Sequence, residues 1–199
     1  WPTNKPVGDH RRVRSAGDDG MKKRVIRKNS VYCSTLASDL LQSLFVAEFV
    51  SPSEKIWLVS AWISDIPILD NTGLGFSGVS PRWGPGKIRL TEVLVELATR
   101  GTTVIVATNQ DTHNDGFKQR LSMKADEAGV SEIVHIIEER ELHTKALLGD
   151  NYYLDGSMNF TNNGLEVNDE TLSLVLEPDD VVRARMEYEA IYKPIVRAK

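Results

Sequence analysis

The chain has 199 residues, a length that suits one domain with a sizeable core. Its composition, 41% hydrophobic and 26% charged, is ordinary for a soluble globular protein. No apolar run approaches the roughly 18 residues that a membrane-spanning helix needs, so we expect no transmembrane segment. Cys33 is the only cysteine, which excludes an internal disulfide and a thiolate metal cluster and favours a cytoplasmic location.

The formal net charge of −4 is unevenly distributed. Residues 1–30 hold nine Lys/Arg and three Asp, whereas the remaining residues hold 15 basic and 25 acidic side chains. The acidic body disfavours a nucleic-acid partner. We expect the basic segment 1–30 to be disordered or, before Met21, non-native. Residues 31–199 are expected to form a single catalytic domain.

The elements are predicted from apolar spacing and from turn residues. In chain order they are a helix over 36–45, a strand over 56–63, an irregular loop over 65–88, a helix over 90–97, a strand over 102–107, a helix over 117–128, strands over 133–137, 141–148, 152–155 and 171–176, and a closing helix from Pro178 marked by Val182, Met186 and Ile191. Strands that alternate with helices early and form a hairpin later predict an α/β sandwich, a mixed sheet flanked by helices.

Two short segments in the last third of the chain carry the candidate chemistry. On a strand, His143 and Lys145 would point to one face about 6.6 Å apart, and Ser157 and Asn159 repeat this spacing. The set suits a phosphate, because Lys145 supplies positive charge while Ser157 and Asn159 donate to the non-bridging oxygens. A neutral imidazole can attack phosphorus. Glu170 is a candidate acceptor for the proton on the other ring nitrogen.

This arrangement resembles the HKD motif of the phospholipase D superfamily, written H-x-K-x4-D and followed by G-S-x-N. The matching positions are His143, Lys145, Asp150, Gly156, Ser157 and Asn159, with Glu170 on the downstream acidic position. One departure is that five residues separate Asp150 from Gly156, where the family has six. A shorter hairpin turn explains the difference if Asp150 and Gly156 support the fold.

The resemblance implies a two-step reaction without metal or cofactor. One histidine forms a phosphohistidine, and a second protonates the leaving alcohol and then activates water. The sequence contains no second His-x-Lys, since the other histidines are His10, His113 and His135. A homodimer that pairs two copies of His143 is therefore expected.

The loop over 65–88 and its end provide further candidates. Arg82, Trp83, Lys87 and Arg89 combine cations with an aromatic ring able to stack on a base, so we treat them as candidate substrate contacts. The alternative is an ordinary mobile surface loop.

Segments at 41–48, 62–67 and 156–161 are also similar to the DpdK group, phospholipase D-like proteins encoded with bacterial DNA-modification and restriction systems. The leading interpretation is therefore a metal-independent nuclease that cuts DNA in bacterial defence, with other restriction-system proteins as partners. Two alternatives stay open. One is a phospholipid-hydrolysing phospholipase D or phosphatidyl transferase, which would need an apolar entrance, and the other is a non-catalytic DNA-binding subunit.

Overall fold

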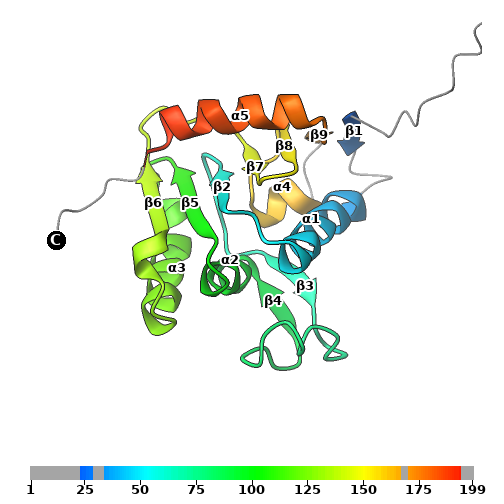
Figure 1. The fold of residues 1–199 in the computed structure, drawn as a ribbon, viewed down its shortest axis with the longest axis vertical. Helices are drawn as coiled ribbons and strands as arrows, with labels where there is room; N and C mark the ends of the chain where they lie inside the picture. The colour runs from blue at the N-terminus through cyan, green and yellow to red at the C-terminus, as the bar shows by residue number, and fades with distance from the viewer. Residues whose placement is uncertain (1–22, 29–33, 167–169, 194–199) are drawn as a thin grey trace, which may run out of the picture.

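The computed structural model describes residues 23–28, 34–166 and 170–193, which contain one seven-stranded sheet and a separate two-stranded sheet (Figure 1). The strands are β1 (Lys23–Lys28), β2 (Lys55–Val59), β3 (Pro67–Asp70), β4 (Lys87–Arg89), β5 (Thr103–Thr108), β6 (Val134–Glu138), β7 (Ala146–Leu148), β8 (Tyr153–Gly156) and β9 (Glu170–Val175). The helices are α1 (Ser34–Val50), α2 (Leu90–Thr99), α3 (Asp115–Glu127), α4 (Asn162–Glu166) and α5 (Pro178–Ile191), with 3-10 turns at Thr112–Asn114 and Ser131–Ile133.

The large sheet is mixed, in the order β1-β9-β8-β7-β2-β5-β6. β2, β5 and β6 are parallel, as expected for strands linked by helices. β7 runs antiparallel to β2, and β7, β8, β9 and β1 pair antiparallel in turn. The predicted α/β sandwich with a mixed sheet is confirmed.

Helices cover both faces of the sheet, and the side chains of β2 alternate between the two cores that these helices form. Ile56 and Leu58 join a core with α1, α2 and α3, whereas Trp57 and Val59 pack against α5. This alternation follows from the two-residue period of a strand. In Figure 1, α5 lies along one side of the sheet and α1, α2 and α3 lie on the other. No helix among the described residues is long and apolar enough to cross a membrane.

Two predicted strands are too long. β2 ends at Val59 rather than 63, and β7 begins at Ala146 rather than 141. The two errors have one cause, because Val59 and Ala146 are partners and the chain leaves the sheet beyond that pair. The irregular loop over 65–88 also contains the paired strands β3 and β4, whose connection is built around the fully buried Asn71. Its side chain accepts from the Phe76 amide at 2.8 Å.

The two ends of the described chain differ from expectation as well. Lys23–Lys28, inside the segment expected to be disordered, forms the edge strand β1, while residues 1–22 and Cys33 lie outside the described residues. In α5 the buried residues are Val181, Ala184 and Tyr188. Val182, Met186 and Ile191, which marked this helix in the sequence, are exposed.

Candidate active site

The candidate residues lie at one edge of the large sheet, because the pairing register aligns the ends of four strands. Val59 of β2 pairs with Ala146 of β7, Ala146 pairs with Asp155 of β8, and Asp155 pairs with Ser173 of β9. β2 and β8 end, and β7 and β9 begin, next to this row. We call this the site edge. Its residues are Ser60, His143, Lys145, Gly156, Ser157, Asn159 and Glu170.

His143 and Lys145 lie in the irregular segment just before β7. His143 is exposed, and Lys145 is half-buried with its ammonium donating to the His143 carbonyl at 2.6 Å. Between them, the side chain of Thr144 is hydrogen-bonded to Tyr192, whose pKa is raised by burial beneath the sheet. An ammonium has three hydrogens, so Lys145 keeps two for a ligand at the exposed His143.

Ser157 and Glu170 are in direct contact across β8 and β9. The Ser157 hydroxyl donates to the Glu170 carboxylate and accepts from the Thr171 amide at 3.0 Å. A serine hydroxyl has one hydrogen, and here Glu170 takes it. Ser157 therefore joins the two strands in this structure instead of offering its proton to a phosphate. No hydrogen bond links Glu170 to His143 within the described part of the chain.

Asn159 is held by a serine outside the motif. The Ser60 hydroxyl shares its one hydrogen between two acceptors, the Asn159 Oδ1 atom at 3.1 Å and the Trp62 carbonyl at 2.9 Å. The Asn159 amide nitrogen has no hydrogen-bond partner among the described residues. Because the oxygen is already engaged by Ser60, the nitrogen is the atom available to donate to an anion at the site edge.

Asp150 occupies the hairpin between β7 and β8, at the sheet end opposite the site edge. One carboxylate oxygen accepts from the Glu54 amide at 2.9 Å, and the other forms an ion pair with Arg185 of α5. The Arg185 guanidinium also lies over the Trp57 ring, 5.6 Å from its centroid. Through these contacts Asp150 links the hairpin to the start of β2 and to α5.

Gly156 is required by a close approach of two strands. A Cβ atom at this position would lie 2.0 Å from the Thr171 carbonyl oxygen, which belongs to the backbone of β9 and cannot move away. Any larger residue would push β8 from β9. The glycine therefore supports the segment that carries Ser157 and Asn159.

The four candidate contacts near the 65–88 loop are not equivalent. Trp83 is only 6% exposed and packs edge-on against Phe49, with ring centroids 5.5 Å apart. It is a core residue, so its predicted stacking on a base is wrong. Arg82 pairs with Glu96 at 2.8 Å, Lys87 is exposed on β4, and Arg89 donates to the Asp65 carbonyl.

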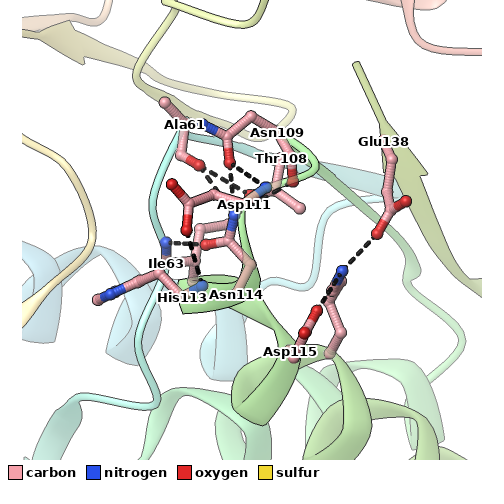
Figure 2. A network of polar contacts seen from close by, with 10 residues as sticks. Ala61, Ile63, Thr108, Asn109, Asp111, His113, Asn114, Asp115 and Glu138 are labelled. Atoms are coloured by element: carbon pink, nitrogen blue, oxygen red, sulfur yellow. Dashed lines mark hydrogen bonds and ion pairs between the residues drawn. The ribbon is translucent and has the colours of Figure 1, made fainter. Parts of the chain in front are cut away.

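The buried side chain of Asn114, in the turn after β5, is hydrogen-bonded to the segment that follows Ser60 (Figure 2). Asn114 is fully buried; it donates to the Ala61 carbonyl at 3.0 Å and accepts from the Ile63 amide at 2.8 Å. Asp111 accepts from the His113 amide at 2.8 Å, and the His113 ring lies 3.0 Å from the Ser64 hydroxyl. The segment after β2 is thus fixed on one side by the 109–114 turn and on the other by Asn159.

The site edge carries groups whose chemistry suits an anion. It presents an exposed imidazole, an ammonium and a free amide nitrogen, which together suit a tetrahedral phosphate. Within the described residues, no group of three or more His, Cys, Asp or Glu side chains is placed to hold a metal ion.

A family model for the phospholipase D-like domain of cardiolipin synthase matches residues 86–192. The chain belongs to the phospholipase D-like family. The match spans α2 to α5 and includes every residue of the HKD motif. No curated protein matches this phospholipase D-like chain.

Solved structures share the phospholipase D-like fold. Nuc from Salmonella typhimurium, a phospholipase D family member, is 14% identical with a TM-score of 0.54, and the alignment covers 84% of this chain and 93% of Nuc. NucT from Helicobacter pylori is 11% identical with a TM-score of 0.52, covering 87% and 96% of the two chains. Phosphatidylserine synthase from Haemophilus influenzae is 10% identical with a TM-score of 0.53, covering 88% of this chain and 40% of the synthase. At these identities the likeness concerns the fold alone.

The sequence prediction missed the residues that position the phospholipase D-like motif from outside it. Ser60 holds Asn159, and Asn114 holds the segment that follows Ser60. Neither belongs to a periodic or motif pattern. Each could only have been suspected as a polar residue placed just beyond a predicted parallel strand.

Proposed function

We propose that this chain is a phosphodiesterase that acts without a metal and uses His143 as its nucleophile. The main support is the HKD spacing of His143, Lys145 and Asn159 on a fold whose register brings their segments to one edge. The exposure of His143 allows a substrate to reach its ring.

The reaction has two steps that this set of groups can carry. A ring nitrogen of His143 attacks phosphorus, a nitrogen–phosphorus bond forms, and the bond to the leaving alcohol oxygen breaks. Lys145 and the Asn159 amide nitrogen stabilise charge on the non-bridging oxygens. Water then attacks the phosphohistidine, which releases a phosphomonoester and restores His143. The leaving oxygen needs a proton in the first step, and the water must lose one in the second.

We assign that proton transfer to His143 of a second copy of the chain. His113 lies nearby in the turn after β5, but β2 separates β5 from β7, and the His113 ring contacts Ser64. A two-fold axis at the site edge would bring two exposed copies of His143 to one phosphate. The functional unit in this proposal is therefore a homodimer.

DNA is the substrate that we favour, in a cytoplasmic restriction system together with its other proteins. This rests on the similarity to the DpdK group and on cations beside the site edge. Arg89 and the 55% exposed Arg120 are both held at Asp65, shortly after the end of β2. Their guanidinium groups can contact phosphates that flank the cleaved one. A polymer with many phosphates would use them, whereas a single headgroup would not.

Phospholipid is the second candidate, favoured by the matched family model, which describes a cardiolipin synthase domain. Three of the exposed apolar residues of the described surface, Val182, Met186 and Ile191, lie together on α5, where they could touch lipid. Release of choline from phosphatidylcholine vesicles, lost in His143→Ala, would establish this candidate in place of the nuclease.

The nuclease is tested by incubating labelled single-stranded and duplex DNA with the protein in excess EDTA. We expect cleavage by the wild type and none by His143→Ala, with His135→Gln of β6 as an active control. If wild type and His143→Ala are equally inactive on every DNA, the nuclease proposal fails. DNA binding without cleavage would then favour a non-catalytic DNA-binding subunit.

A further inference from the structure

Trp62 is an exposed aromatic residue two positions after Ser60 of the site edge. Its side chain is 41% exposed, although its neighbours Ala61 and Ile63 are almost completely buried. Its carbonyl oxygen accepts from the Ser60 hydroxyl at 2.9 Å, and that same hydroxyl contacts Asn159. The backbone of Trp62 therefore lies beside the amide that we assign to phosphate binding, and its indole extends toward the 109–114 turn.

The indole is also held in one orientation. Its Nε1 atom donates to the Asp111 carboxylate at 3.2 Å. The other oxygen of Asp111 accepts from the His113 amide, which fixes the carboxylate within the turn shown in Figure 2. An exposed ring that is already oriented loses little conformational entropy when a flat ligand stacks on it.

The charges around Trp62 distinguish a base from a phosphate. Hydrogen bonds from the His113 amide and from the Trp62 indole lower the pKa of Asp111, so this exposed carboxylate is ionised at neutral pH. An ionised carboxylate at the ring edge repels a phosphate and can accept a hydrogen bond from an N–H group of an unpaired base. Beyond it, Arg89 and Arg120 at Asp65 offer positive charge to neighbouring phosphates.

We propose that Trp62 stacks on an unpaired nucleobase next to the cleaved phosphate, which makes single-stranded nucleic acid the preferred ligand of this edge. The proposal rests on the nuclease function above and adds its strand preference. A base inside a duplex has both faces covered by its neighbours, so only an unpaired base offers a face to the indole.

The test measures binding of two labelled 12-nucleotide strands, oligothymidylate and a fully abasic strand with the same phosphates. The protein is the full chain carrying His143→Asn, which prevents cleavage during the titration. Trp62→Ala should weaken binding of oligothymidylate about tenfold and of the abasic strand less than about twofold, as loss of one stacked base predicts. Trp62→Phe should retain most of the affinity. Val50→Ala, which changes an exposed residue at the end of α1, should bind both strands like the parent.

Equal weakening of both strands by Trp62→Ala, or no weakening of either, overturns the role of Trp62. Equal weakening together with dissociation to monomers in sedimentation experiments would assign Trp62 to an interface between copies instead. If the parent binds neither strand and the wild type cleaves no DNA, both the nuclease function and the stacking role of Trp62 are rejected. Normal binding of both strands by Trp62→Ala therefore rejects the stacking role of Trp62 and leaves the nuclease function standing.

Discussion

The hydroxyl of Ser60 lies 3.1 Å from the Oδ1 atom of Asn159, which joins the end of β2 to the segment after β8. The Ser60 hydroxyl oxygen also accepts a hydrogen bond from the Phe160 amide at 3.4 Å. Ser60 is fully buried, so water cannot replace these partners when the hydroxyl is removed. The orientation of the Asn159 amide thus depends on a residue far from the motif in sequence.

Ser60→Ala should lower kcat about tenfold, because a free Asn159 side chain loses the geometry in which it stabilises the phosphate. Stability should fall by about 1–3 kcal/mol, the cost of one buried hydrogen-bonding group left unpaired. Initial rates on a labelled oligonucleotide and urea unfolding provide the two measurements. Ser43→Ala, which removes an exposed hydroxyl bonded to the Asp39 carbonyl, is the matched control. An unchanged kcat in Ser60→Ala would show that Asn159 needs no such support.

Gly156→Ala should destabilise the fold by about 2–3 kcal/mol, since its Cβ would collide with backbone. The collision is with the Thr171 carbonyl oxygen, 2.0 Å from the added atom. Gly116→Ala in α3 meets nothing within 4 Å and should instead stabilise by about 0.5–1 kcal/mol, because alanine favours a helix. Urea unfolding of the two variants should therefore shift in opposite directions. Similar midpoints for both would be inconsistent with the tight β8–β9 contact.

Asp150→Asn should reduce stability by about 1 kcal/mol and change kcat less than about twofold, since a partly exposed ion pair contributes modestly. The carboxylate is paired with Arg185 and accepts from Glu54, both away from the site edge. Asp180→Asn removes the exposed pair with Arg183 on α5 and should have little effect on stability. A large drop in kcat with normal unfolding would give Asp150 a part in the chemistry and contradict the supporting role.

The sequence predicted the fold class and the motif well because both depend on local patterns. The strand geometry predicted from the two-residue spacing was wrong, because His143 and Lys145 precede β7 whereas Ser157 and Asn159 follow β8. Spacing could not show which partner each polar atom finds, so the donation of the Ser157 proton to Glu170 was not foreseen. The burial of Trp83 depends on Phe49, in a distant helix, and no local pattern signals such a contact.

The homodimer predicts how activity responds when inactive subunits are mixed with active ones. If each site needs His143 from both chains, dimers with one His143→Ala subunit are inactive. After unfolding and refolding of mixtures, activity should fall as the square of the wild-type fraction. A linear decrease would mean that each chain works alone and would direct attention to His113 as the proton donor.

Trapping of a covalent intermediate tests the role of His143 most directly. A labelled oligonucleotide is mixed with excess enzyme in EDTA, quenched in alkali within a fraction of the turnover time and digested for mass spectrometry. We predict a substrate-derived phosphoryl group on the peptide that contains His143, labile in acid and absent from His143→Ala. Full turnover with no adduct on His143, or an active His143→Ala enzyme, would contradict the proposed mechanism.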